Sequence, residues 1–201
     1  MRRLLCSLFL LLPLTALGAQ WRIAATGGSA DSRGDARNDA DPDRPEFHAE
    51  RPVTFALAVG HAAGPWHLNL EVRRTTADLS EVSRSVAVTT YGAFSAWGAA
   101  FELQRRIAGS SGSAAAWAGL GAGIDRWNLD GATARWREVA RGSIAGEFPM
   151  GRGWRFVVRG EASAGPSIFT RAELPEGFSP RMTWRTGVAL GVAREFGVRR
   201  R

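Results

Sequence analysis

The most constraining feature of this sequence is an alternating segment near its end, residues 182–196. Every second residue in it, beginning with Met182, is apolar or β-branched, apart from Arg194. The intervening positions are mostly Gly and Ala, with a charge near each end at Arg185 and Glu195. A period of two is typical of a β-strand with two unlike faces. A small-residue face with a few charges suits the crowded interior of a narrow barrel, so the apolar face is predicted to point to lipid.

Seven more segments have strand character, and their connections alternate in length. The eight predicted strands span residues 20–27, 52–61, 65–74, 85–103, 113–127, 133–148, 153–165 and 181–196. Short connections lie at 62–65, 105–112 and 150–153, and longer polar ones at 28–50, 74–84, 126–133 and 166–180. Short turns on one rim and long loops on the other predict an all-β fold, an eight-stranded antiparallel up-and-down transmembrane β-barrel. Its turns would face the periplasm and its loops the outside of the cell.

The N-terminus has the features of a secretory signal peptide. Arg2 and Arg3 precede an apolar run at 4–14, and small residues follow up to Ala19. The run is shorter than the roughly 20 apolar residues that span a bilayer as a helix. We therefore expect residues 1–19 to be cleaved and residues 20–201 to form one barrel domain in the bacterial outer membrane. The only cysteine, Cys6, would leave with the signal peptide, so no disulfide and no Cys-ligated metal is expected.

All positively charged side chains other than histidine are arginines, because the sequence contains no lysine. The formal net charge is +7, and removal of Arg2 and Arg3 would lower it to +5. Such a balance can suit nucleic acid, but an exported chain meets none, and the arginines are scattered rather than clustered. Acidic lipopolysaccharide is a better partner than nucleic acid. The interpretation favoured most is that the arginines serve as lumen charges and interfacial anchors. We expect a monomer among outer-membrane lipids.

Aromatic residues gather near the ends of the predicted strands. Those near the turns are Trp21, Trp66, Phe101, Phe148, Trp154 and Phe196, and those near the loops are Trp127, Trp136 and Trp184. Indole and phenyl rings partition to the headgroup level of a membrane, so these positions predict two aromatic girdles. The alternative is that they are core aromatics of a soluble sandwich, and for the fold as a whole the alternative is a soluble periplasmic barrel.

The last predicted strand carries a family resemblance. Residues 189–196 alternate and close on an aromatic residue, Phe196, with residues 197–201 after it. In this respect, and in its strand and loop pattern, the chain resembles small eight-stranded outer-membrane β-barrel proteins of the opacity-protein/OmpX-like or OmpA-transmembrane-like group. The resemblance implies that Phe196 belongs to the signal that the outer-membrane assembly machinery recognises.

The alternation also assigns charged residues to the lumen. Besides His67, the predicted lumen residues are Glu71, Arg73, Glu102, Arg135, Arg137, Arg141, Glu147, Arg155, Arg159, Glu161, Arg185 and Glu195. An eight-stranded barrel has little room for free water, so buried charges there must pair. Arginine suits bidentate pairing with carboxylates, and the set predicts an ion-pair network that plugs the lumen. Arginines outnumber carboxylates in it, which leaves room for a trapped anion or a buried water.

Catalytic and metal-binding patterns are weak. Some outer-membrane barrels of this size modify lipid A with a His and a Ser, but here His67 has Asn69 as its neighbour on the same face. Carboxylates at 39, 41, 43 and 50 match the spacing of a calcium loop, yet Arg44 stands where that loop requires Gly. Residues 33–35 read Arg-Gly-Asp, a tripeptide too short to be diagnostic. We predict no metal, no cofactor and a solvated first loop.

These observations favour a non-enzymatic outer-membrane barrel that displays polar extracellular loops for envelope integrity, adhesion or another surface interaction. A small-solute pore is the alternative, and a lipid A-modifying enzyme is a third hypothesis.

Overall fold

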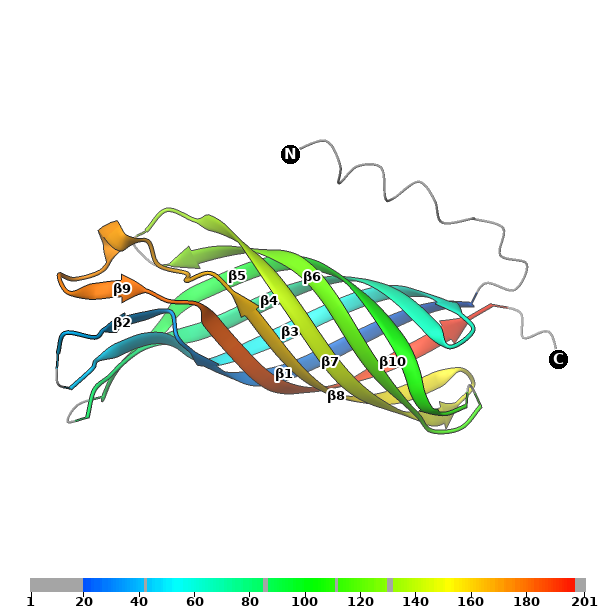
Figure 1. The fold of residues 1–201 in the computed structure, drawn as a ribbon. Coiled ribbons are helices and arrows are strands. Elements are labelled where there is room, and N and C mark those ends of the chain that lie inside the picture. The colour runs from blue at the N-terminus through cyan, green and yellow to red at the C-terminus, as the bar shows by residue number, and fades with distance from the viewer. Residues whose placement is uncertain (1–19, 42, 85–86, 111, 130–131, 198–201) are drawn as a thin grey trace.

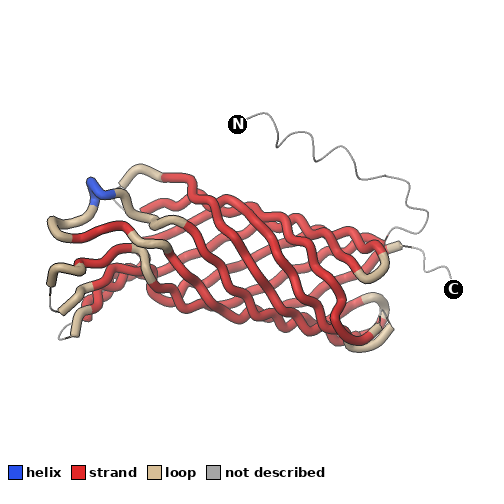
Figure 2. The backbone as a smooth tube through the Cα atoms, viewed as in Figure 1, coloured by secondary structure: helices blue, strands red, loops and turns tan. Residues whose placement is uncertain are grey.

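Eight long antiparallel strands form one closed ring (Figures 1 and 2). The computed structural model describes residues 20–41, 43–84, 87–110, 112–129 and 132–197, so the predicted signal peptide lies outside it. The strands are β1 (Gln20–Arg33), β3 (Glu46–Ala63), β4 (Trp66–Val82), β5 (Ala87–Gly109), β6 (Ala115–Leu129), β7 (Arg135–Gly151), β8 (Trp154–Gly165) and β10 (Thr183–Phe196).

The ring closes because β1 pairs on both of its edges. Trp21 lies opposite Phe196 of β10, and Ile23 lies opposite Val59 of β3. Each strand otherwise pairs with the one before it and the one after it, which confirms the predicted up-and-down barrel. No helix in the described part of the chain is long and apolar enough to cross a membrane.

The prediction of loops at 28–50 and 74–84 was partly wrong. β1 runs on to Arg33, β3 already starts at Glu46, and β4 continues to Val82. These strand ends are polar on their outward side, for example at Asp31 and Arg33, because beyond the lipid that side meets water. The polar composition therefore marks the part of the wall above the membrane, not a loop.

A small cap lies on the rim opposite Gln20 and Gly197, the ends of the described chain (Figure 1). It includes β2 (Ala36–Asn38), a 3-10 turn at Arg171–Glu173 and β9 (Phe178–Pro180), with β2 paired to both β3 and β9. The cap and the adjoining strand ends share one apolar cluster, the cap cluster, made of Ala36, Ala49, Ala77, Ala93, Phe94, Ala96, Trp127, Ile168, Phe169 and Phe178. The barrel mouth thus has a packed core of its own.

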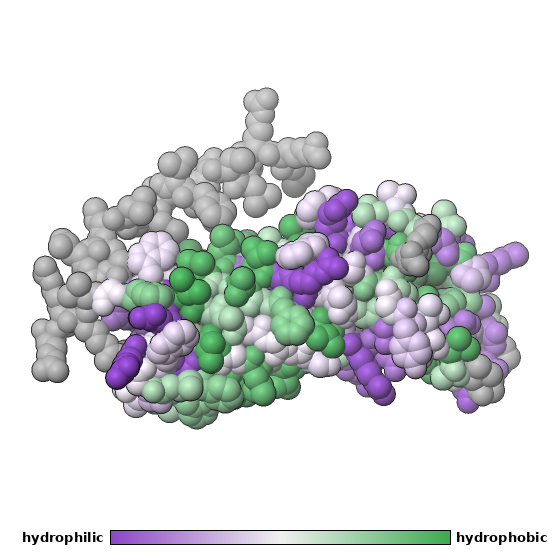
Figure 3. All heavy atoms as spheres, turned by 180° about the vertical axis from the view of Figure 1, so that it is seen from behind, coloured by the Kyte–Doolittle hydropathy of each residue, from purple (hydrophilic) through white to green (hydrophobic). Residues whose placement is uncertain are grey.

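The outer surface is apolar over one stretch of the wall and polar beyond it (Figure 3). Large side chains such as Leu57, Leu70, Leu120, Ile144 and Leu190 are each more than half exposed, as expected of residues in contact with lipid. The predicted girdle residues listed above are likewise exposed, with one exception.

Trp127 was wrongly assigned to the girdle. Only 3% of it is exposed, because it follows Asp125 in the inward phase of β6 and belongs to the cap cluster. Trp97, in the outward phase of β5, is 56% exposed near the loop side. The strand phase, not the closeness to a strand end, decides which face an aromatic side chain occupies.

Candidate functional site

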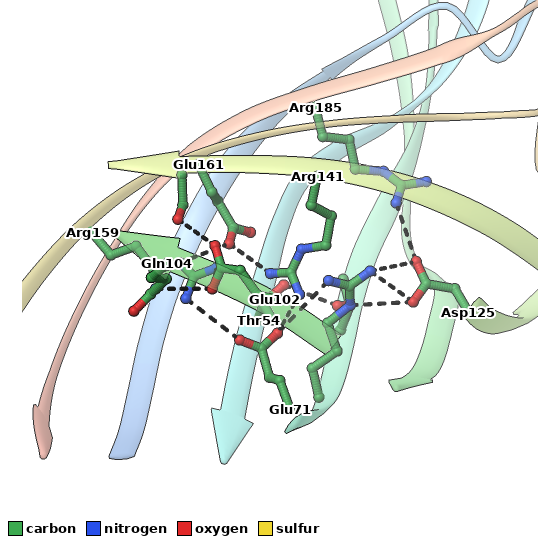
Figure 4. Close-up of polar contacts among 12 residues, drawn as sticks. Thr54, Glu71, Glu102, Gln104, Asp125, Arg141, Arg159, Glu161 and Arg185 are labelled. Carbon is green, nitrogen blue, oxygen red and sulfur yellow. Dashed lines mark hydrogen bonds and ion pairs between the residues drawn. The ribbon is translucent and has the colours of Figure 1, made fainter. Parts of the chain in front are cut away.

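The centre of the lumen holds linked ion pairs (Figure 4). Arg141 of β7 lies 2.6 Å from Glu71 of β4 and 2.7 Å from Glu161 of β8. Arg159 lies 3.0 Å from Glu102 and 3.4 Å from Glu161. These side chains come from β4, β5, β7 and β8, so they connect opposite walls of the barrel.

Closer to the loop side, Asp125 of β6 forms ion pairs with two arginines. It accepts hydrogen bonds from Arg73 at 2.8 and 2.9 Å, and Arg185 lies 3.7 Å away. Asp125 was missing from the predicted lumen set, because it stands close to the point where the fifth predicted strand was expected to give way to a loop. Its inward phase, two residues beyond Gly123, was the available signal.

A second group of charges lies toward the turns. Arg22 of β1 pairs with Glu147 of β7 at 2.5 Å, and Arg155 of β8 pairs with Glu195 of β10 at 2.8 Å. Arg155 also lies 3.8 Å from Glu147, which links the two pairs. Arg22 was missing from the predicted set, although it has the inward phase of the first strand.

The charges that form ion pairs inside the lumen balance, unlike the predicted set, in which arginines outnumber carboxylates. The ion pairs inside the barrel join Arg22, Arg73, Arg141, Arg155, Arg159 and Arg185 to Glu71, Glu102, Asp125, Glu147, Glu161 and Glu195. The cavities on either side of Glu71 and Arg159 measure about 20 Å³ each. Each has room for about one water molecule.

Arg135 and Arg137 do not join this network. Both lie at the start of β7 and turn to the loop that follows β8: Arg135 pairs with Glu173, and Arg137 donates to the carbonyl of Ser167 at 2.5 Å. Hydrogen bonds from Arg135 hold the pKa of Glu173 down to about 2. These two arginines anchor the loop instead of filling the lumen, and without them the predicted set holds as many arginines as carboxylates.

Asp35 joins the cap to the barrel wall through buried hydrogen bonds. Its carboxylate is fully buried and accepts hydrogen bonds from the hydroxyl of Thr183 and from the backbone N–H groups of Ala49 (3.2 Å) and Ile168 (3.5 Å). Burial raises the pKa of this carboxyl, an effect that these hydrogen bonds and the charge of Arg185 oppose. Because Asp35 is buried, the Arg-Gly-Asp tripeptide does not present its carboxylate on the surface.

The residues of the calcium-like spacing have other contacts. Asp39 pairs with Arg181, Asp41 accepts from the N–H of Asp43 at 2.8 Å, and Glu50 accepts from Thr89 at 2.9 Å. Within the described ranges, no three His, Cys, Asp or Glu side chains come together as metal ligands would.

Two histidines make ring contacts with tryptophan side chains. His67 stacks on Trp117 with ring centroids 3.8 Å apart, inside the lumen near the turns. His61 makes an edge contact with Trp21 at 5.4 Å. Each of these imidazoles has a packing role in the structure.

The comparisons with known proteins agree with this architecture. No family model and no curated protein matches the sequence. Among solved structures, the Neisserial surface protein A superposes with a TM-score of 0.58 at 8% identity, over 88% of this chain and 97% of that one. The outer membrane protein OprG from Pseudomonas aeruginosa gives 0.57 at 10% identity, over 90% and 97%.

The chain has the fold of a small outer-membrane β-barrel. The predicted resemblance to small eight-stranded barrels of this kind is thereby confirmed at the level of the fold. Identities this low show how the chain folds, and the role of this barrel has to be argued from its own residues.

Proposed function

We propose that this chain is a non-enzymatic protein of the bacterial outer membrane with a closed lumen, which presents its polar loop rim at the cell surface. The observation that carries the proposal is the charge-balanced network that fills the lumen from Arg155 near the turns to Asp125 near the loops. The mature barrel would begin at Gln20, work as a monomer among outer-membrane lipids and lipopolysaccharide, and rely on Phe196 for assembly.

Two successive barriers support a closed lumen. Around Glu71 and Arg159, the remaining cavities are of single-water size. Above them, Phe94, Phe169 and Trp127 pack against each other in the cap, with Phe94 lying 5.9 and 6.2 Å from the other two ring centroids. A hydrated ion would have to displace both an ion-pair network and an apolar core.

The loop rim offers the surface for interaction. One cleft on it, of about 410 Å³, lies where β1 and β4 end and β3 begins, and its lining includes Arg33, Arg44, Glu46 and His48. Mixed charge of this kind favours a polar partner over an apolar one. The histidine contacts described above, with His67 stacked on Trp117, support a role without catalysis.

Planar-bilayer recording with the refolded barrel tests the closed lumen. We expect no steady conductance from the wild type, and a small-solute pore would instead conduct with an ion selectivity that Glu161→Gln shifts. In parallel, protease added to intact cells should cut the loop at 166–180 and spare the turn at 150–153. Cutting at that turn without permeabilisation would contradict the proposed orientation.

A further inference from the structure

One line of residues across the outer wall alternates between arginine and tryptophan. Arg74 of β4 lies opposite Trp97 of β5, which lies opposite Arg126 of β6, which lies opposite Trp136 of β7. All four side chains are on the outward face, and Trp97 and Trp136 are 56% and 58% exposed. We call these four residues the Arg-Trp row.

The row follows a boundary between apolar and polar wall. On the turn side of its first three members, the next outward residues are Val72, Ala99 and Ile124, which are in register with one another. On the loop side they are Thr76, Ser95 and Asn128, again in register. Guanidinium and indole groups at such a boundary stand at the depth of lipid headgroups.

The two arginines of the row have no acidic partner in the described part of the chain. No described carboxylate lies within 4.0 Å of Arg74 or Arg126. Arg74 instead stacks on Trp97 at 5.2 Å from the ring centroid. This distinguishes the row from the lumen, where every arginine discussed above is paired.

The geometry lets both arginines reach one ligand. Strands two apart in a sheet are separated by about 10 Å, so the long side chains of Arg74 and Arg126 can converge over the Trp97 ring between them. Guanidinium groups bind phosphate through paired hydrogen bonds. The apolar strip formed by Val72, Ala99 and Ile124 continues directly from this point and suits an acyl chain.

We infer that the Arg-Trp row binds the phosphate headgroup of a lipid in the outer leaflet, whose acyl chain lies along Val72, Ala99 and Ile124. This inference rests on the proposed function, which places the loop side outside the cell. It goes further in naming the residues and the chemical group that they recognise.

The turn side of the barrel provides a matched control. There Arg105 stacks on Trp66 at 5.5 Å and Arg194 stacks on Trp154 at 5.4 Å, but as separate pairs instead of a continuous row. If arginines at the membrane boundary act only as general anchors, both sets contribute equally to lipid binding.

The test is native mass spectrometry of the refolded barrel in neutral detergent, titrated with lipid A. The double variant Arg74→Gln/Arg126→Gln should bind about tenfold more weakly. Arg105→Gln/Arg194→Gln should bind as the wild type does, and Arg74→Lys/Arg126→Lys should recover part of the loss. Glu138→Gln should strengthen binding, because this carboxylate lies opposite Ile124, next to the row.

Three results would overturn the inference: equal losses in the two glutamine double variants, no loss in either, or displacement of lipid A by inorganic phosphate at equal concentration. The last would indicate a site for free phosphate. Heat-dependent gel migration checks that each variant is folded, and if the double variant does not refold, Arg126→Gln alone carries the test. None of these outcomes depends on whether the lumen conducts.

Discussion

Arg73 and Asp125 meet across an intervening strand. They belong to β4 and β6, and β5 separates them, with Gly98 in register between the two. The guanidinium passes over this glycine and donates to both carboxylate oxygens, at 2.8 and 2.9 Å. A Cβ atom at position 98 would lie 2.1 Å from an Asp125 oxygen, so the pair needs the absence of a side chain there.

Gly98→Ala should therefore destabilise the barrel. The added methyl group overpacks the lumen and displaces the Asp125 carboxylate, which should cost on the order of 1–3 kcal/mol. Urea titration of the barrel refolded into lipid measures the change. Gly142→Ala is the control, because its Cβ would meet no atom closer than 3.7 Å and should leave the midpoint almost unchanged. Equal shifts in the two variants would contradict this role of Gly98.

Loss of Asp125 should cost more than loss of Glu161. Asp125→Ala leaves Arg73 with only a 3.8 Å contact to Glu71 and removes the ion-pair partner of Arg185, and breaking a buried pair costs about 3–5 kcal/mol. After Glu161→Ala, Arg141 still has Glu71, so the effect should be smaller.

The same urea titration ranks these two variants. Asp31→Ala, which breaks an exposed pair with Arg33, should change stability by less than about 1 kcal/mol. If neither lumen substitution changed the free energy of unfolding, the result would contradict a packed lumen, because only a water-filled interior could screen the freed arginines.

A charged side chain introduced on the lipid-facing wall should impair folding of the barrel. Leu190 is 52% exposed on the outer wall, where an arginine costs about 2–4 kcal/mol near mid-membrane. Leu190→Arg should lower the folded yield in lipid, whereas Ala189→Ser, beside a lumen cavity, should be tolerated. Gel migration of unboiled samples reports the folded fraction. Equal tolerance of the two substitutions would count against a membrane location for this wall.

The cap loop should loosen in acid. The pKa of Glu173 is about 2 in the folded chain, below its ordinary value of about 4.3. Its link to Arg135 therefore stabilises the loop fully above the ordinary value and is lost as the pH falls toward 2.

Hydrogen exchange at the N–H of Thr170, which donates to Glu173 at 2.8 Å, measures this loosening. Protection should fall between about pH 4.5 and 2 in the wild type. In Glu173→Gln it should be lower and nearly independent of pH over that range. Constant protection in the wild type would show that the loop is held by other contacts.

The sequence by itself determined the faces of the strands. Side chains alternate across a β-strand whatever its neighbours are, so Leu190 could be assigned to lipid and Glu71, Arg141 and Arg159 to the lumen from their phase alone. The same alternation places Asp125 and Trp127 inside, because both share the inward phase at the end of the fifth predicted strand, residues 113–127. The eight strands and their order followed from the same pattern.

Only the tertiary structure decided which charges meet. The register around the closed ring brings Arg73 to Asp125 across β5, and it brings Arg135 to Glu173 in the cap. Phase gives the face of a residue but not its height along the barrel axis, so pairing across the lumen is not readable from one strand. The cap could not be predicted from the sequence either. The burial of Asp35 depends on contacts with Ala49, Ile168 and Thr183, which are distant in sequence.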